Sequence, residues 1–284
     1  MKNIIILINC IDQKAIVASV TSFIAETDGN ITYLDQHVDE YQNVFFMRLE
    51  CAFDANDFDI EQFKNKFDNR LAKQLKMSCQ IYSSEEKPRM AIFVSKYAHC
   101  LYDILGRYAA KELLVEIPII ISNHLDLKPI AEKFDIAFEH VPLTAENRAN
   151  GELRHLELLK KHAIDFVVLA RYMQIITPQF ISLFQNKIIN IHHSFLPAFP
   201  GAKPYHSAFA RGVKIIGATS HYVTEDLDEG PIIEQDTTRV LHSHSIDDFI
   251  MKGRDLERTV LARAIALHSS RKTMVYNNKT VIFS

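Results

Sequence analysis

The chain has 284 residues, and at roughly 150 residues per domain this length predicts two domains. Hydrophobic residues make up 48% and charged residues 24%, with only 8 glycines and 9 prolines, so the composition supports packed cores and excludes a disordered or fibrous protein. The 32 basic and 35 acidic side chains give a net charge of -3, which argues against nucleic acid or an anionic membrane as a generic partner.

Cysteine usage and the N-terminal residues both favour a cytoplasmic protein. The four cysteines are far apart and form no C-x-x-C pair, so we expect reduced, buried thiols rather than a zinc ribbon or a redox motif. The apolar run at residues 4–8 is too short for a signal peptide. No run approaches the roughly 18 apolar residues that a membrane span requires.

The first 83 residues predict a ferredoxin-like sandwich with the order β-α-β-β-α-β. Strands are expected at 3–9, 31–39, 44–52 and 78–82, and the alternation in 44–52 predicts that one face of that strand is buried. Asp12 is placed to cap a helix that carries Ile16, Val20 and Ile24 on one stripe and ends at Gly29. A second helix is expected over residues 60–75.

Residues 84–88 are polar, end in a proline and predict a linker to a second domain at 89–284. Strands are expected at 90–94, 117–121, 166–170, 188–191, 217–223 and 232–240. Helices are expected near 100–105, 152–162 and 246–265, with a final hairpin turn at Asn277 and Asn278. This alternation predicts a Rossmann-like α/β domain with a mostly parallel sheet covered on both faces.

Polar residues with catalytic potential gather between Asn190 and His206 and again between residues 221 and 231. Asn190 and His192 are two apart on a predicted strand, so both side chains leave the same face at its carboxyl end. Asp228 lies in a Leu-Asp-Glu-Gly-Pro turn and is expected to pair with His192. An imidazolium and an amide can then donate to an oxyanion while Asp228 orders or deprotonates a water, which predicts attack on a carbonyl group.

Other interpretations of these residues stay open at this point. Asn190 and Asp228 can simply cap turns, and His192 can be a satisfied core histidine. The remaining histidines match no metal-binding motif, so no metal is expected. The stretch at 169–176 is either core or the wall of a pocket for a flat heterocycle, and Pro200 and Gly201 belong to the same polar segment as His206.

Two long motifs carry a family resemblance. N-I-H-H-S-F-L-P-A-F-P-G-A-K-P-Y-H at 190–206 and A-T-S-H-Y-V-T-E-D-L-D-E-G-P-I-I-E-Q-D at 218–236 closely resemble the formyltetrahydrofolate deformylases. The front domain resembles an ACT domain, with C-x-D-Q-K-x-I-V-A at 10–18 and D-Q-H-V-D at 35–39. The rear domain is similar to folate-dependent formyltransferases, whose catalytic Asn, His and Asp fall on Asn190, His192 and Asp228, with His221 and His193 in support.

This resemblance implies hydrolysis of 10-formyltetrahydrofolate to tetrahydrofolate and formate without a cofactor. Such an enzyme balances the one-carbon folate pool and supplies formate for purine biosynthesis. The pteridine is then expected against two short segments, with the formyl carbon presented to Asn190 and His192. The implied substrate-binding residues are Arg171, Tyr172, Met173, Gln174, Ile175, Thr224, Glu225 and Leu227.

The ACT resemblance implies a homo-oligomer, a dimer or a tetramer, with a small amino acid as effector. Asp12 and Asn30 are the effector-binding candidates, although an N-cap and a turn residue explain them equally well. Ala15 stands where related ACT domains commonly carry glycine.

Three alternative functions are weighed against hydrolysis. Phosphoribosylglycinamide formyltransferases carry a glycine-rich turn for the substrate phosphate, whereas residues 94–99 here contain no glycine, which favours water as the acceptor. A methionyl-tRNA formyltransferase needs surface for tRNA, which a net charge of -3 does not favour. An amino-acid sensor without activity would not need all three of Asn190, His192 and Asp228.

Overall fold

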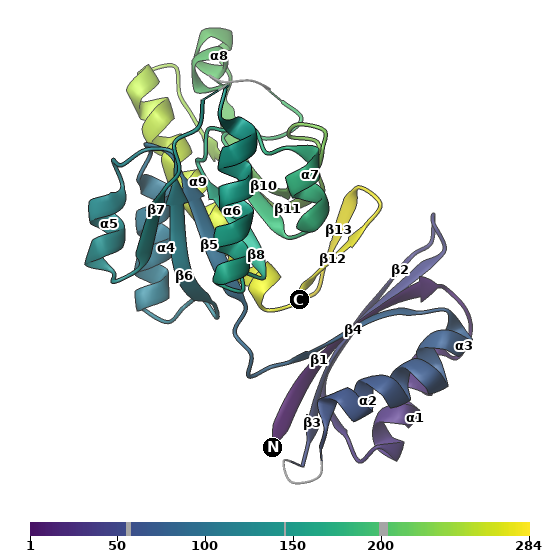
Figure 1. The fold of residues 1–284 in the computed structure, drawn as a ribbon. Coiled ribbons are helices and arrows are strands. Elements are labelled where there is room, and N and C mark those ends of the chain that lie inside the picture. Colours follow the sequence, from purple (N-terminus) through teal and green to yellow (C-terminus); the bar gives the residue numbers. More distant parts are fainter. Residues whose placement is uncertain (55–57, 145, 199–203) are drawn as a thin grey trace. The chain divides into compact units, whose positions relative to one another are not determined.

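The computed structural model describes residues 1–54, 58–144, 146–198 and 204–284. The chain divides into two compact units, one of residues 1–87 together with 282–284 and the other of residues 88–281 (Figure 1). The last three residues group with the first unit because Phe283 is buried and the Ser284 N–H donates to Asp35 Oδ2 at 3.1 Å. The sequence pattern predicted that these three residues belong to the second domain.

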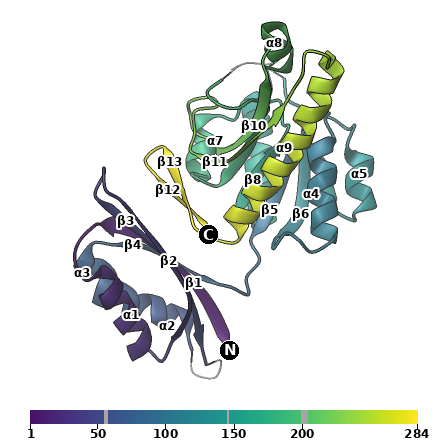
Figure 2. The ribbon, with the colours of Figure 1, turned by 180° about the vertical axis from the view of Figure 1, so that it is seen from behind.

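The first unit is an antiparallel sheet with helices on one face, in the predicted order β-α-β-β-α-β (Figures 1 and 2). Its strands are β1 (Lys2–Ile11), β2 (Asn30–Asp39), β3 (Val44–Phe53) and β4 (Ser78–Ser83), arranged as β2-β3-β1-β4. The helices are α1 (Ile16–Glu26) and α2 (Ile60–Phe67), followed by a π-helical segment (Asp68–Ala72) and α3 (Lys73–Leu75). The expected single helix over 60–75 is therefore interrupted.

Asp12 does not cap α1, so this expectation was wrong. The residue before the helix is Ala15, whose φ of 69° lies in the left-handed region and which makes no side-chain cap. The Asp12 N–H instead donates to the Asn43 carbonyl at 2.9 Å, which ties the end of β1 to the turn before β3. The left-handed backbone gives the physical reason for glycine at position 15 in related domains.

Both faces of β3 are buried, whereas the alternation predicted one. Phe45 and Met47 enter the helix-covered core, but Phe46 and Arg48 on the other face are also less than 2% exposed. Side chains of the neighbouring strand β2 pack beside them on this face, because the Arg48 guanidinium lies 5.2 Å from the Tyr33 ring centroid and Phe46 stacks on a histidine of the same strand. Hydrophobic alternation does not reveal such contacts between strands.

The second unit contains a seven-stranded sheet in the order β11-β10-β9-β8-β5-β6-β7. The strands β5 to β9 run parallel, and β10 pairs antiparallel with both β9 and β11, so the sheet is mostly parallel as predicted. The bounds are β5 (Arg89–Val94), β6 (Glu116–Ser122), β7 (Ala137–His140), β8 (Phe166–Ala170), β9 (Ile188–His192), β10 (Ile215–Tyr222) and β11 (Ile232–Arg239).

Helices cover both faces of this sheet (Figures 1 and 2). On one face lie α4 (His99–Ala109), α5 (Lys128–Lys133) and the long α9 (Ile246–Ser269), and on the other lie α6 (Arg148–Lys161) and α7 (Pro178–Leu183). A short α8 (Pro204–Arg211) follows β9, and a hairpin of β12 (Thr273–Tyr276) and β13 (Lys279–Ile282) ends the chain. The sequence pattern missed β7, α5, α7 and α8 because elements of four to eight residues show too little periodicity.

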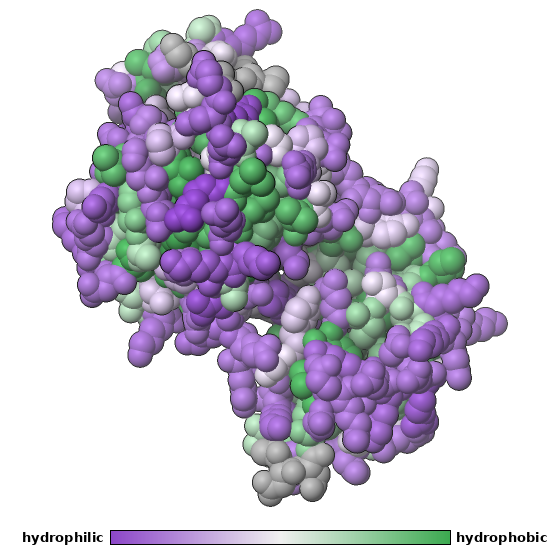
Figure 3. Space-filling model, viewed as in Figure 1, coloured by the Kyte–Doolittle hydropathy of each residue, from purple (hydrophilic) through white to green (hydrophobic). Residues whose placement is uncertain are grey.

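Polar side chains cover most of the face drawn in Figure 3, with apolar side chains in separate patches on each unit. Across the described ranges, no helix has the length and apolarity to cross a bilayer. All four cysteines are unpaired, and Cys10, Cys51 and Cys100 are buried, but Cys79 is only half-buried, contrary to the expectation.

Candidate active site

The carboxyl end of β9 presents two polar side chains to one face. Asn190 and His192 belong to this strand, and its pairing with β10 places His221 opposite Asn190 and Thr219 opposite His192. Because directly opposed residues of paired strands point to the same side of a sheet, His221 lies beside Asn190. Asn190, His192 and His221 therefore form a cluster of one amide and two imidazole side chains across the two strands.

Asp228 reaches this cluster from the loop after β10. Its own backbone is left-handed, with a φ of 60°. Gly230 makes the loop possible, since a Cβ at this position would lie 1.8 Å from the Tyr222 carbonyl oxygen. The Tyr222 N–H donates to the Pro231 carbonyl at 2.9 Å, which ties the loop back to the end of β10. Glycine and proline thus hold the carboxylate in place, as the sequence pattern suggested.

The three predicted residues lie in one cluster, in which His192 contacts Asp228 and Asn190 contacts His221. His192 Nδ1 lies 3.2 Å from Asp228 Oδ1, and His221 Nε2 lies 3.7 Å from the same oxygen. Asn190 Nδ2 lies 3.2 Å from His221 Nε2. The amide, the two rings and the acid come from two stretches of chain that are about thirty residues apart.

The hydrogen-bond partners fix how these groups are oriented. His221 Nδ1 lies 2.9 Å from the Tyr222 carbonyl, which only accepts, so this nitrogen carries a hydrogen. In the neutral ring Nε2 then accepts from the Asn190 amide, which leaves a second amide hydrogen free to donate. His192 Nδ1 donates to Asp228, whereas its buried Nε2 has no hydrogen-bond partner among the described residues. The His192 ring also lines the cavity, whereas His155, whose ring nitrogens are likewise unpartnered among the described residues, is buried in the core.

The pKa of Asp228 lies below the usual range of an aspartate. Burial alone would raise it, but the hydrogen bond from His192 and the nearby His221 ring outweigh this effect. The side chain is 21% exposed, so it keeps some access to solvent. Asp228 is therefore a carboxylate at neutral pH, better suited to orient a ring or a water than to remove a proton strongly.

The cluster opens into a cavity of about 420 Å³. The segment after β8 and the loop after β10 supply most of its wall, and Asn190, His192, His193, His221 and Asp228 line it together. Every residue that the resemblance implied for the pteridine also lines this cavity, namely Arg171, Tyr172, Met173, Gln174, Ile175, Thr224, Glu225 and Leu227. Their roles in binding stay predictions.

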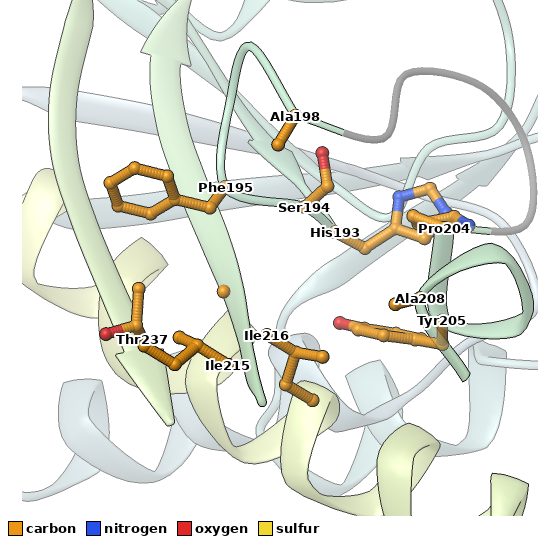
Figure 4. Close-up of a pocket in the computed structure, with 11 residues that line it drawn as sticks. His193, Ser194, Phe195, Ala198, Pro204, Tyr205, Ala208, Ile215, Ile216 and Thr237 are labelled. Carbon is orange, nitrogen blue, oxygen red and sulfur yellow. The ribbon is translucent and has the colours of Figure 1, made fainter. Parts of the chain in front are cut away.

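His193 separates this cavity from a second one of about 390 Å³, drawn in Figure 4. Figure 4 shows His193, Ser194 and Phe195 on one side and Tyr205 and Ile216 on another, with mostly apolar side chains around the space. The His193 ring lies 5.2 Å from that of His192 and 5.9 Å from that of Tyr205. Pro200 and Gly201, which the sequence placed in the same segment, lie outside the described residues.

A second buried carboxylate, Glu257 of α9, was missed by the sequence analysis. Only 1% of its side chain is exposed, and it accepts hydrogen bonds from the Tyr205 hydroxyl at 2.7 Å and from His99 Nε2 at 2.8 Å. Arg171 Nε lies 3.5 Å from the same carboxylate. Burial alone would raise the pKa of Glu257, but its bond with His99 and the charge of Arg171 lower it. An acid on the apolar stripe between Leu256 and Val260 was the available signal.

Within the described ranges, His99, Cys100 and Glu257 lie close enough together to share a metal ion. This group contains none of the histidines from residue 192 onward. Glu257 is already engaged by Tyr205 and His99, and the Arg171 guanidinium beside it would repel a cation. The donor set is therefore better described as a hydrogen-bonded network than as a metal centre.

The turn between β5 and α4 is tied to the wall of the cavity. Ser95 is 3% exposed, its hydroxyl donates to Asn123 Oδ1 at 2.7 Å, and it accepts from the Met173 N–H at 3.0 Å. The Tyr97 ring lies 5.0 Å from the Arg171 guanidinium. The glycine-free turn is thus held by the Ser95 hydroxyl and by the contact of the Tyr97 ring with Arg171.

The effector candidates lie in the first unit. Asp12 follows β1 and Asn30 begins β2. Across the part of the chain that the structure describes, no hydrogen bond or ion pair joins these two side chains, so their role as a binding pair stays a prediction.

Known proteins are similar to this chain, some over its whole length and others mainly over its second unit. A formyl transferase family model matches residues 88–265. A formyltetrahydrofolate deformylase from Synechocystis sp. is 53% identical over 98% of each chain. The crystal structure of a formyltetrahydrofolate deformylase from Pseudomonas syringae has a TM-score of 0.97 at 44% identity and covers 100% of this chain and 95% of its own. A glycinamide ribonucleotide transformylase from Symbiobacterium toebii has a TM-score of 0.66 at 27% identity, over 72% of this chain and 97% of its own.

Proposed function

This chain belongs to the formyltetrahydrofolate deformylase family, and from that premise we propose that Asn190, His192 and Asp228 hydrolyse 10-formyltetrahydrofolate to tetrahydrofolate and formate. One observation carries the assignment of these residues. The buried Nε2 of His192 has no hydrogen-bond partner among the described residues, although Nδ1 of the same ring is held by Asp228. A buried polar atom left unpaired beside a cavity is a group kept for a ligand.

Asn190 and His192 stabilise the charge that develops when water adds to the formyl carbon. Asn190 and His192 line the cavity, and the free Asn190 hydrogen and the Nε2 hydrogen of the protonated His192 ring donate to the formyl oxygen as it becomes an oxyanion. Collapse of the tetrahedral intermediate breaks the bond between the formyl carbon and the folate nitrogen. The proton that the attacking water gives up passes to that nitrogen, which leaves as an amine, and formate is released.

Asp228 orders the attacking water and holds the ring of His192. Its lowered pKa keeps it ionised at neutral pH, which suits charge pairing better than strong general-base catalysis. The carboxylate is partly exposed at the cavity, so a water can reach it. In this proposal the reaction uses no cofactor and no metal.

The direct test is formate release from 10-formyltetrahydrofolate by the purified protein, with chelator present and no amine acceptor added. We expect one formate for each tetrahydrofolate, and a loss of roughly a hundredfold or more in kcat for His192→Ala. Turnover that remains unchanged in this variant would remove His192 from the mechanism, and the absence of formate from the wild-type reaction would remove the function itself.

The family membership weakens the phosphoribosylglycinamide formyltransferase and amino-acid sensor alternatives. Glycinamide ribonucleotide transformylases are more distant relatives, and they cover only 70–72% of this chain. A sensor without activity would not need the convergence of Asn190, His192 and Asp228 on one cavity. No feature of the site favours either alternative over hydrolysis.

The first unit is proposed to regulate a cytoplasmic homo-oligomer, a dimer or a tetramer, by binding a small amino acid at Asp12 and Asn30. Its βαββαβ order and its left-handed residue before α1 support this proposal. In the cell the enzyme would balance the folate pool and supply formate for purine biosynthesis. Calorimetric titration with glycine and methionine tests the effector site, and heat that persists in an Asp12→Ala, Asn30→Ala double variant would place the site elsewhere.

A further inference from the structure

Arg171 lines the cavity, and its backbone has a conformation that residues other than glycine rarely adopt. It follows β8 directly, and its φ of 60° lies in the left-handed region. Glycine takes this conformation without steric cost, whereas a residue with a Cβ does not. An unfavourable backbone at a residue that lines an active-site cavity points to a function for its side chain.

Two groups hold the Arg171 guanidinium, and together they form a general cation site. Glu257 supplies a buried carboxylate 3.5 Å from Nε, and Tyr97 supplies a ring whose centroid is 5.0 Å from Cζ. A carboxylate and an aromatic face are also the groups that bind a protonated amine. Within the described residues Arg171 Nε has no hydrogen-bond partner, so the guanidinium occupies this site without forming all of its possible hydrogen bonds.

Arg171 stands between the cavity and these two groups. Its own side chain lines the cavity and is 10% exposed, whereas neither Glu257 nor Tyr97 is among the lining residues. The cavity volume of about 420 Å³ is near the lower end of the roughly 300–1,000 Å³ that holds one small ligand. A bound folate ring system therefore leaves little space for a second organic substrate unless Arg171 is removed.

We propose that Arg171 excludes amines from the reaction, because its guanidinium occupies the cation site of Glu257 and Tyr97 in which an amine would otherwise bind. This inference rests on the proposed function. It makes Arg171 the residue that determines which nucleophile reacts, and it makes Glu257 the positioning residue that holds Arg171. Water, which needs no such site, remains as the acceptor.

The reaction with an amine follows the same bond changes as hydrolysis. A primary amine first loses its ammonium proton to solvent, and its lone pair then forms a bond to the formyl carbon. The bond between the formyl carbon and the folate nitrogen breaks, and the folate nitrogen takes up the proton that the attacking amine gives up. The products are a formamide and tetrahydrofolate in place of formate and tetrahydrofolate.

The test compares products rather than rates, so a general loss of activity does not affect it. Wild type and Arg171→Gly are given 10-formyltetrahydrofolate with glycinamide as the amine, and formylglycinamide and formate are both quantified. Glycine suits the left-handed backbone at this position. We expect the ratio of formylglycinamide to formate to rise roughly tenfold or more in the variant, because a bound amine has a high effective concentration. An unchanged ratio would overturn the proposal.

Arg254→Ala is the matched control. Its guanidinium also lies near the Tyr97 ring, at 5.9 Å, but this residue is exposed and does not line the cavity. We expect it to keep the wild-type product ratio, and a rise equal to that of Arg171→Gly would overturn the specific role of Arg171. Methylguanidine added to Arg171→Gly should refill the cation site and lower the ratio again.

Calorimetry makes the inference testable without turnover. Glycinamide is titrated into Arg171→Gly and into wild type, each without folate. Saturable binding in the variant alone supports an amine site that Arg171 fills, and the absence of binding in the variant overturns it. Formate release by the wild type is scored separately, so failure of the proposed hydrolysis is distinguished from failure of this inference.

Discussion

Two carboxylates of the second unit pair with histidines, yet their surroundings differ. Asp228 lies 3.2 Å from His192 Nδ1 and Glu257 lies 2.8 Å from His99 Nε2, and both acids have a lowered pKa. Glu257 also engages Tyr205 and Arg171 and is 1% exposed, whereas Asp228 is 21% exposed at a cavity.

The comparison shows that a buried acid and histidine do not by themselves mark a catalytic centre. The two clusters differ in their access to the cavity, because Asp228 and His192 both line it whereas Glu257 does not. The Glu257 carboxylate contacts three partners from other segments, and these contacts stabilise the packing of those segments against α9. Substitutions at the two acids should therefore separate activity from stability.

The largest effect is expected for Asp228→Asn. The amide keeps the size and suits the left-handed backbone, but it lacks the charge that holds His192 and the acceptor that orders water. We expect kcat to fall by roughly a hundredfold to ten-thousandfold. Steady-state formate release measures it. A loss of less than threefold would show that Asp228 is a structural acid like Glu257.

Glu257→Gln should give the opposite pattern. Removing one charge of a buried group leaves Arg171 without its carboxylate, which costs about 3–5 kcal/mol in the free energy of unfolding. Denaturant unfolding measures this cost. Glu61→Gln is the control, because its pair with Lys64 is exposed and is worth only about 0.5 kcal/mol. Equal stabilities of the Glu257 and Glu61 variants would contradict the comparison.

A smaller effect is expected for Gly253→Ala, which acts on the Glu257 network from the neighbouring turn of α9. A Cβ at residue 253 would lie 2.1 Å from Tyr205 Cζ, so the ring that donates to Glu257 must move. We expect a loss of about 1–3 kcal/mol in the free energy of unfolding.

Gly106→Ala provides the matched control in α4. A Cβ there meets nothing within 4 Å, so alanine should stabilise the helix by about 1 kcal/mol. The two substitutions are chemically identical and differ only in their neighbours. The prediction fails if both change thermal stability in the same direction.

The sequence predicted the Asp228 centre far better than the Glu257 network, for a physical reason. Asn190 and His192 are two apart on a strand, and Gly230 and Pro231 mark the turn that carries Asp228, so local spacing shows these groups together. Glu257 depends on Tyr205, His99 and Arg171 from three other elements, and no local pattern connects them.

The fold shows the same limit. Long periodic elements such as α9 and the strands β5, β8 and β9 were predicted near their observed bounds, but the cap of α1 was not. Asp12 lies three residues before Ala15, which occupies the N-cap position, and residue type alone did not show where the helix begins. The burial of Phe46 and Arg48 was missed because it depends on neighbours from another strand.

The pH dependence of stability gives the smallest expected difference and depends on the sign of the Asp228 pKa shift. The folded pKa lies below the value of about 3.9 for an unfolded aspartate, so the unfolded state binds the proton more readily. The contribution of Asp228 is therefore fully present above about pH 5 and is lost as the pH falls through the unfolded value towards the folded one. Asparagine does not titrate, so the unfolding free energy of wild type minus that of Asp228→Asn should become less favourable to wild type between pH 6 and pH 3, in paired denaturant titrations. A difference that stays constant or grows over this range would mean that His192 and His221 do not hold the carboxylate in its charged form.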